Sequence, residues 1–287
     1  MRKTIFLLSC GLLFACDKPI SERQQLEKAA AGGDAIAQFN LGVKYAMGEG
    51  VTKDEATAFE WYQKAAEQGN DRGQYNLGLM YAQGKIVPKD EGKAFAWFQK
   101  AAAQGSDRAQ FVVGKMYAHG AGIAKDEAKA FEWFKKAAAQ GDVKAMNEVG
   151  DAYDYGKGVP KDEAKAVDWY QKGASKGDSE AQFSLGVAYH LGQGVPKDAA
   201  KGFEWYEKAA LQGEIGAQAA IISLYMNGVG VPKDDVRAYA WANVLAAKLS
   251  TQESGKTRDY LENSLTPEQR AQGQKLSAEL FAKMPKK

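Results

Sequence analysis

Apolar and polar positions recur along this chain with a period of 36 residues. The six tryptophans mark the period, each 36 residues from the next: Trp61, Trp97, Trp133, Trp169, Trp205 and Trp241. A fixed period of this length is typical of stacked structural repeats and not of one globular core. We number the repeats one to six by their first residues, which are Asp34, Asn70, Ser106, Asp142, Asp178 and Glu214.

Each repeat contains a first helical stretch. In repeat one, Ala37, Leu41 and Tyr45 lie four residues apart and form one apolar stripe, which predicts a helix over 35–47. Gly42 follows Leu41 and recurs in every repeat but the last, where Ile222 replaces it. Because a glycine inside a helix costs about 1 kcal/mol against alanine, its recurrence indicates a close helix–helix contact. We expect different packing at Ile222.

A second helical stretch follows a short turn that several repeats write as Gly-x-Gly-Val-Pro-Lys-Asp. The aspartate, Asp54 in repeat one, is a typical N-cap. Ala58, Trp61 and Tyr62 then share a helical face, which predicts a helix over 55–67. We expect the tryptophans to be the large members of a large–small packing pattern that faces neighbouring helices.

The two ends of the array differ from its repeats. Residues 25–33 match the end of a second helix and predict a half-repeat after a linker at 16–24, so the array spans 25–249. Residues 250–287 predict a C-terminal helical cap, with a short helix at about 254–263. A last helix is expected to start after Thr266 as N-cap, with Pro267 at its first position, and to end near Lys283.

Residues 1–15 are typical of a secretory signal, with Arg2 and Lys3 ahead of a short apolar run. Leu13, Ala15 and Cys16 resemble a bacterial lipobox, which predicts lipidation at Cys16; an ordinary cleaved signal is the alternative. We therefore expect a periplasmic protein of a Gram-negative bacterium, anchored by lipid to the inner or outer membrane. Asp17 resembles an inner-membrane retention signal and favours the inner membrane.

The balance of charged residues bears on which partners the chain can bind. The chain holds 38 basic and 36 acidic residues, and the predicted signal contains two of the basic ones and no acid. The expected mature chain is therefore neutral, whereas nucleic-acid-binding proteins usually carry a basic surface. We expect no nucleic-acid partner. Cys10 and Cys16 are the two cysteines, so the mature chain has no pair for a disulfide.

The repeated unit A-x₃-L-G-x₂-Y-x₂-G-x-G-V-x-K-D-x₃-A-x₂-W-x₂-K-A-A-x₂-G resembles the Sel1-like repeat (SLR) family, a branch of the tetratricopeptide-like solenoids. The resemblance covers about 25–249. It implies a right-handed α/α superhelix that serves as a non-enzymatic scaffold for protein partners. Some SLR lipoproteins resemble immunity proteins against toxins that act in the periplasm, which gives an alternative function. A cysteine-rich branch linked to β-lactams has helix-stapling cysteines that this chain lacks.

Catalytic motifs are missing from the sequence. The two histidines, His119 and His190, have no metal-ligand partner at helical spacing, and no Ser-x-x-Lys occurs. The Gly-x-Gly turns are interpreted as chain reversals and not phosphate loops, and the six aspartates as caps and not calcium ligands. We therefore expect no catalytic residue, metal or cofactor. A hydrolase acting on β-lactams or the cell wall is the less favoured alternative.

The first helices of a solenoid line its inner surface, so positions that vary there are candidates for partner binding. Repeat four stands out because it carries Glu148, Asp151, Asp154 and Tyr155 in one helix, with Asn147 where other repeats have an aromatic residue. Such a patch favours a basic or amphipathic partner segment, although variable solvated positions would look the same. We expect a monomer that binds a protein here, with four further candidates: Lys115, His119, Leu191 and Met47.

Overall fold

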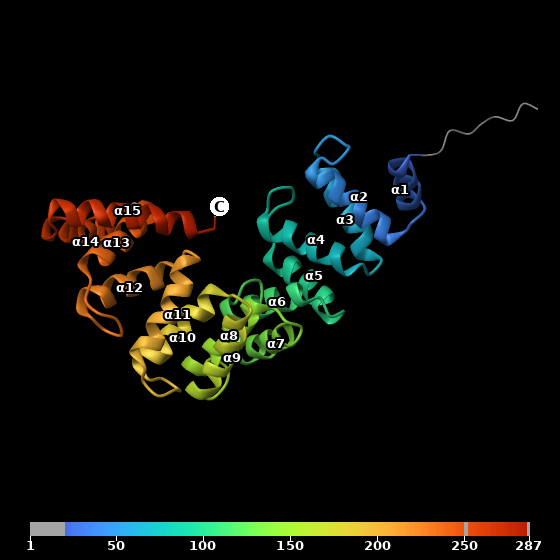
Figure 1. Ribbon diagram of the computed structural model, residues 1–287. Helices are drawn as coiled ribbons and strands as arrows, with labels where there is room; N and C mark the ends of the chain where they lie inside the picture. The colour runs from blue at the N-terminus through green and yellow to red at the C-terminus, as the bar shows by residue number, and fades with distance from the viewer. Residues whose placement is uncertain (1–20, 250–251, 286–287) are drawn as a thin grey trace, which may run out of the picture. The chain divides into compact units, whose positions relative to one another are not determined.

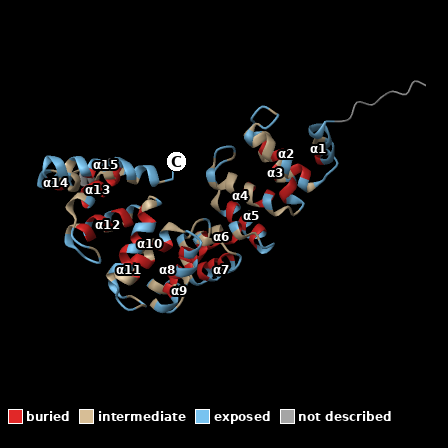
Figure 2. Ribbon diagram, in the orientation of Figure 1, coloured by how far each residue is buried: buried red, intermediate tan, exposed pale blue. Residues whose placement is uncertain are grey.

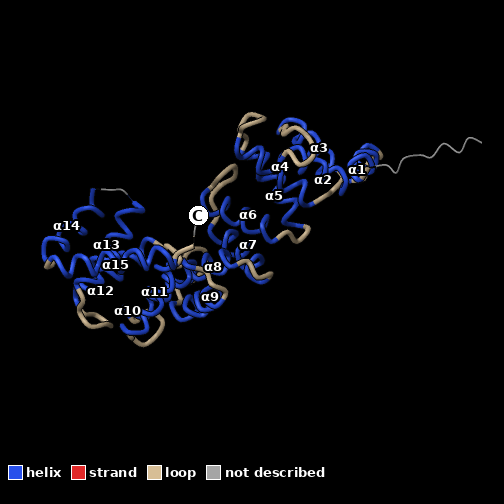
Figure 3. Tube along the Cα trace, turned by 45° about the horizontal axis from the view of Figure 1, so that its top comes forward, coloured by secondary structure: helices blue, strands red, loops and turns tan. Residues whose placement is uncertain are grey.

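The computed structural model of the chain describes residues 21–249 and 252–285. Within these two ranges all regular secondary structure is helical, in fifteen helices without a strand, which confirms the predicted all-α class (Figure 1, Figure 3). By its internal contacts the chain divides after Pro88 into two compact units. They are called the N-terminal part and the C-terminal part below.

Antiparallel helix pairs build the N-terminal part, and the predicted helices at 35–47 and 55–67 are confirmed. The helix α1 precedes them and packs on the first helix of repeat one. The four helices are α1 (Glu22–Ala31), α2 (Ala35–Met47), α3 (Glu55–Glu67) and α4 (Asp71–Gln83).

The start of α1 corrects one prediction. It begins at Glu22, inside the segment 16–24 that we expected to be a linker. The Ser21 side chain accepts a hydrogen bond from the Gln24 backbone N–H, and the Gln24 side chain accepts one from the Ser21 N–H. This reciprocal capping box satisfies two backbone donors at the helix start. The sequence Ser-Glu-Arg-Gln carries that signal.

The C-terminal part continues the same alternation of first and second helices and ends in the two helices of the cap. Its repeat helices are α5 (Glu91–Ala103), α6 (Asp107–His119), α7 (Glu127–Ala139), α8 (Val143–Tyr155), α9 (Glu163–Ser175), α10 (Ser179–Leu191), α11 (Ala199–Leu211), α12 (Ile215–Asn227) and α13 (Asp235–Leu249). The last two helices are α14 (Gln252–Ser264) and α15 (Pro267–Lys283). Thr266 caps α15 and Pro267 lies at its start, as predicted.

Aspartate side chains begin the second helices, as predicted. Asp126 is representative, since its Oδ1 accepts from the Lys129 backbone N–H at 2.9 Å. The carboxylate replaces the helical partner that the first backbone N–H groups lack. The first helices end at glycines in the left-handed conformation, such as Gly156 with φ of 68°.

In repeats three to six, the second glycine of the turn packs against the preceding repeat. A Cβ added at Gly158 would lie 2.2 Å from the carbonyl oxygen of Glu127, at the start of α7. Gly194 stands in the same way against Glu163, at the start of α9. No side chain fits in that space, and the positive φ of both residues also favours glycine. The turn therefore ties neighbouring repeats together.

The recurring mid-helix glycine makes a close helix–helix contact, as the sequence predicts, and the structure places an aromatic ring against it. A Cβ added at Gly114 of α6 would lie 2.6 Å from Cδ1 of Phe134 in α7, and one at Gly150 would lie 2.6 Å from Cδ1 of Tyr170. In repeat six the large and the small side chain exchange places. Ile222 is buried at the position of the glycine, and Ala242 is buried at the position of the aromatic ring. The different packing expected at Ile222 is thus confirmed.

The tryptophans correct another expectation. Buried and exposed positions alternate along the repeat helices (Figure 2). Five of the tryptophans are only half-buried, and the core ring of those five repeats is instead the residue that follows the tryptophan, such as Phe134 after Trp133. The Lys136 ammonium lies 4.0 Å from the Trp133 ring centre, and a lysine three residues on covers each of the other four rings. Trp241 alone among the six is fully buried, with 3% of its surface exposed.

Buried glutamines link successive helices. Gln110 donates to the Ala102 carbonyl at the end of α5 and accepts from the Gln140 side chain at 2.8 Å. Gln182 and Gln212 repeat this bond at 2.8 Å. Repeat four breaks the series, since Met146 occupies the place of the buried glutamine. Repeat four therefore lacks this glutamine link between helices.

The C-terminal cap closes the array. The predicted short helix is found as α14, and α15 packs along α13 (Figure 1). Trp241, Leu245 and Leu261 belong to one buried cluster there. None of the helices in the described ranges is both long enough and apolar enough to cross a membrane.

Candidate functional site

The candidate site lies in the C-terminal part, on the first helices of repeats three to five. Six of the eight residues predicted for partner binding come from α6 and α8, and Leu191 ends α10. The eighth, Met47, ends α2 in the N-terminal part and is 67% exposed. Two hollows lie along these helices.

The larger hollow, of about 450 Å³, is lined by α6, α7 and α8. Its charges neutralise one another. Lys115 donates to Glu148 Oε1 at 2.9 Å, and Lys125 pairs with Glu127 at 2.7 Å. The exposed His119 ring bonds through Nδ1 to the Lys115 carbonyl at 2.8 Å. Three of the predicted residues, Lys115, His119 and Glu148, thus line one hollow, and Glu148 is not a free anion.

Asp151 also has an internal partner. The Tyr170 hydroxyl of α9 donates to its Oδ1 at 2.8 Å, a bond that the sequence analysis missed. Burial raises the pKa of Asp151 above its ordinary value, although the Tyr170 hydrogen bond acts in the other direction. Burial and the Asp151 charge together raise the pKa of Tyr170 well above that of a free tyrosine. This carboxylate therefore belongs to the packing between α8 and α9.

The raised pKa of Asp151 has a consequence for stability. Above that pKa the folded state carries an ionised, desolvated carboxylate, and this cost disappears as the pH falls through the folded-state value. We expect Asp151→Asn, whose amide oxygen still accepts from Tyr170, to raise the unfolding free energy at neutral pH. The gain should vanish toward pH about 4, near the ordinary carboxyl pKa.

Urea denaturation of both proteins across this pH range checks the prediction. Carboxylates other than Asp151 titrate in both proteins, so their effect on the unfolding free energy cancels in the difference between variant and wild type. The other charged groups that act on Asp151 are Glu148, Asp154 and Lys157. A less stable variant at neutral pH would show instead that the charge-assisted bond from Tyr170 outweighs desolvation.

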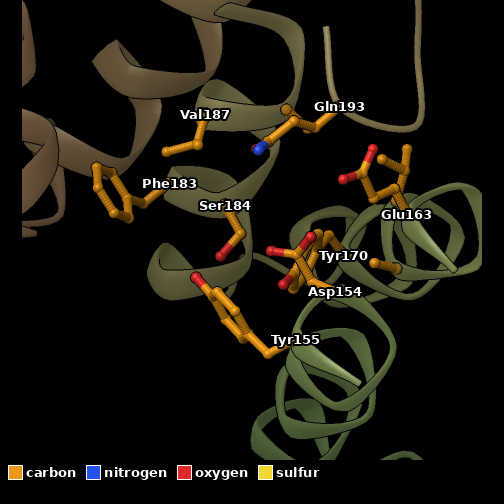
Figure 4. A pocket seen from close by; sticks show the side chains of 11 residues that line it. Asp154, Tyr155, Glu163, Tyr170, Phe183, Ser184, Val187 and Gln193 are labelled. Atoms are coloured by element: carbon orange, nitrogen blue, oxygen red, sulfur yellow. The ribbon is translucent and has the colours of Figure 1, made fainter. Parts of the chain in front are cut away.

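The smaller hollow, of about 70 Å³, lies between repeats four and five (Figure 4). Asp154 and Tyr155 at the end of α8 face Ser184 and Val187 of α10, and Glu163 contributes a second carboxylate. Burial raises the pKa of Asp154, which Lys161 partly offsets. We call this hollow the Asp154 pocket; its remaining lining residues include Tyr170, Phe183 and Gln193.

Two large apolar side chains stand exposed beside this pocket. Tyr155 is 65% exposed and Leu191 is 55% exposed. Leu191 lies four residues after Val187, on the same face of α10. Sequence comparison between repeats could have found Ser184 and Val187, which occupy the same varying positions as Glu148 and Asp151. Gln193 and Tyr170 come from a turn and a second helix and carried no such signal.

Asn147, which replaces an aromatic ring, is buried under this surface. Its Nδ2 donates to Glu180 Oε2 at 3.5 Å, and its Oδ1 has no hydrogen-bond partner. Burial also raises the pKa of Glu180. The loss of the ring has therefore made room for a polar contact between α8 and α10.

Two further predictions concern chemistry. In the part of the chain that the structure describes, no three His, Cys, Asp or Glu side chains are grouped to hold a metal ion. The predicted lipidation site, Cys16, lies outside the described residues, so lipidation stays a prediction.

Two solved structures resemble the chain closely. One is a protective antigen of uropathogenic Escherichia coli strains that displays an SLR fold, with 36% identity and a TM-score of 0.83. The match covers 91% of this chain and 56% of the antigen, so this chain spans little more than half of the antigen's length. The other is a Sel1 repeat protein of Oxalobacter formigenes, with 35% identity, a TM-score of 0.74, and coverage of 79% of this chain and 93% of that one.

A weaker likeness joins the chain to an immunity protein of Pseudomonas aeruginosa, at 20% identity and a TM-score of 0.46, covering 86% of this chain and 82% of that one. This level of similarity carries no functional argument. No curated protein matches the chain.

The repeats themselves are matched by the family model of the Sel1 repeat. It matches all six, at residues 35–70, 71–106, 107–142, 143–178, 179–214 and 217–248. The helix pairs described above recur in these segments. The chain therefore belongs to the Sel1 repeat family.

Proposed function

We propose that this protein is an exported, lipid-anchored scaffold that binds another protein through the first helices of repeats three to five. The proposal is supported above all by Tyr155 and Leu191, large apolar side chains that stand 65% and 55% exposed at equivalent positions of adjacent repeats. The framework around them repeats, whereas their own position varies from repeat to repeat. Exposed aromatic and aliphatic side chains beside a hollow are typical anchors of protein interfaces.

Affinity capture from the native cell envelope tests this proposal. We expect the Tyr155→Ser, Leu191→Ser variant to capture about tenfold less of the specific partner than the wild type does, because it lacks two anchor residues. Tyr260→Ser is the matched control, because Tyr260 is also 65% exposed but lies on α14, outside the repeats. Equal capture by wild type and the double variant would refute the proposal.

Asp151 is left unchanged in this variant. Replacing it would break the hydrogen bond from Tyr170, so that a loss of packing could not be separated from a loss of binding. The identity of the captured protein separates two roles. A secreted toxin held in a one-to-one complex would favour an immunity protein, and a resident envelope protein would favour a scaffold. Turnover of a β-lactam or of cell-wall material by the purified chain would contradict the non-enzymatic part of the proposal.

The lipid anchor has its own test. We expect Cys16→Ala to move the protein from the membrane fraction to the soluble fraction, since acyl chains contribute about 0.8 kcal/mol per buried CH₂ group. Cell fractionation and blotting measure the distribution. Cys10→Ala, a change inside the predicted signal, is the control and should leave the protein on membranes. Membrane retention of Cys16→Ala would show that lipidation at Cys16 is not the anchor.

A further inference from the structure

We propose that the Asp154 pocket receives the charged end of a lysine or arginine side chain from the bound partner, with an apolar neighbour of that residue packing on Val187 and Leu191. This inference rests on the proposed function and names the chemistry of the partner segment. The partner is a polypeptide that places a basic residue beside an apolar one.

The lining of the pocket is the first argument. Its lining includes the carboxylates of Asp154 and Glu163 and no lysine or arginine. Three hydroxyl-bearing side chains also line it, namely Tyr155, Tyr170 and Ser184 (Figure 4). In Figure 4 the Asp154 carboxylate and the Tyr155 hydroxyl point toward Ser184 across the hollow. At about 70 Å³ the pocket is the size of a side-chain end and not of a secondary-structure element. Oxygen acceptors of this kind bind ammonium or guanidinium donors.

The state of Asp154 is the second argument. Glu148 is paired with Lys115, Asp151 accepts from Tyr170, and Glu163 is paired with Lys161 at 2.7 Å. Within the described ranges Asp154 has neither a hydrogen bond nor an ion pair. Burial raises its pKa, so its charge is partly desolvated, and the Lys161 charge, which is paired with Glu163, offsets this effect only in part. A cation from outside would supply the missing partner.

Comparison between repeats is the third argument. Repeats one to three carry alanine at the position of Asp154, namely Ala46, Ala82 and Ala118. The helix pair therefore forms without a carboxylate there. The wall formed by α10 is mostly apolar, since it contributes Phe183 and Val187 beside Ser184, and Leu191 follows Val187 on the same face. A surface that is anionic on one side and apolar on the other is complementary to a segment with adjacent basic and apolar residues.

Peptide selection on the purified chain tests the inference. The probe is a random twelve-residue library displayed on phage. We expect enriched peptides to contain a lysine or arginine next to an apolar residue. The best peptide is then synthesised with its basic residue intact and with that residue changed to norleucine or citrulline, and its affinity is measured by fluorescence anisotropy.

Two variants of the chain give the contrast. Asp154→Ala should bind the basic peptide about tenfold more weakly than wild type, the loss expected for one partly buried charge pair. Asp168→Ala is the matched control, because it removes one carboxylate from the exposed outer face of α9, where repeat two carries Ala96. The uncharged peptide should bind wild type and Asp154→Ala equally, which assigns the loss to this one pair.

Three results would overturn the inference: equal binding of the basic peptide by Asp154→Ala and wild type, selection of peptides without a cation, or no enrichment above bare support. Its failure is distinguishable from failure of the proposed function. If Asp154→Ala captures the native partner fully while the Tyr155→Ser, Leu191→Ser variant does not, the scaffold role stands and the basic-residue pocket is wrong. If that double variant also captures fully, the scaffold role itself fails.

Discussion

Replacing Gly114 with isoleucine should lower the unfolding free energy by about 3 kcal/mol, at the upper end of the range for overpacked cores. A Cβ at this position would lie 2.6 Å from Cδ1 and Cε1 of Phe134, whose ring is 4% exposed and cannot turn into solvent. Isoleucine adds three more carbons to the same space. The helices α6 and α7 would have to separate, and urea denaturation followed by circular dichroism measures the loss.

The second substitution in this experiment is Phe134→Ala. Alone it should cost about 3–5 kcal/mol through the cavity that it leaves. Combined with Gly114→Ile it reproduces the Ile222 and Ala242 pair of repeat six, where the chain itself exchanges the two sizes. If the two losses were independent, the double variant would lose the sum of both. We expect it to be about 2 kcal/mol more stable than that sum, which is the size of the coupling free energy between residues in contact.

Additive losses in the double variant would contradict this account of the core. They would mean that repeat six tolerates Ile222 because of the cap around it and not because Ala242 makes room. Gly255→Ile on α14 is a control for isoleucine in a helix, because a Cβ there meets nothing within 4 Å. Its effect should stay within the ~1 kcal/mol that helix propensity allows.

Trp241→Ala should destabilise the C-terminal part by about 4 kcal/mol, whereas Trp133→Ala at the same repeat position should cost about 1–2 kcal/mol. Trp241 is 3% exposed in the cluster that includes Leu245 and Leu261, so its removal leaves a large cavity. Trp133 is half-buried, with its outer face covered by Lys136. An exposed cation–π pair of this kind contributes only about 0.5–1 kcal/mol.

Hydrogen exchange and urea denaturation together measure the difference, because repeat arrays can open locally at one end. Protection should fall first in α13 and α15 for Trp241→Ala, and near α7 for Trp133→Ala. Equal losses would show that the tryptophans play one structural role throughout the array, as their spacing alone suggests.

The helices and their boundaries were predictable from the sequence because the forces that set them act over one or two turns. An aspartate cap, a left-handed glycine and an apolar stripe each depend on residues a few positions apart. The 36-residue period then repeats those local signals, so that the helices of repeat one were predicted with correct bounds. The start of α1 at Glu22 was not predicted, although the capping box that sets it is also a local signal in the sequence.

The candidate site was predictable in position but not in chemistry. Spacing placed Glu148, Asp151, Asp154 and Tyr155 on one helix, and all four lie on α8 as expected. Which carboxylate is free depends on groups from neighbouring helices. Lys115 is 33 residues before Glu148, and Tyr170 is 19 residues after Asp151. Asp154 is left without such a partner.

The sequence by itself determined the family, the helical class and the repeat, because these follow from local pattern and its period. Only the tertiary structure decided which tryptophan is buried, which ring fills the glycine gap and which charges are neutralised. Trp241 and Trp133 occupy the same place in the repeat, yet α15 folds back over only one of them. Burial and ion pairing arise between helices that stacking brings together, and the period of a sequence does not contain those distances.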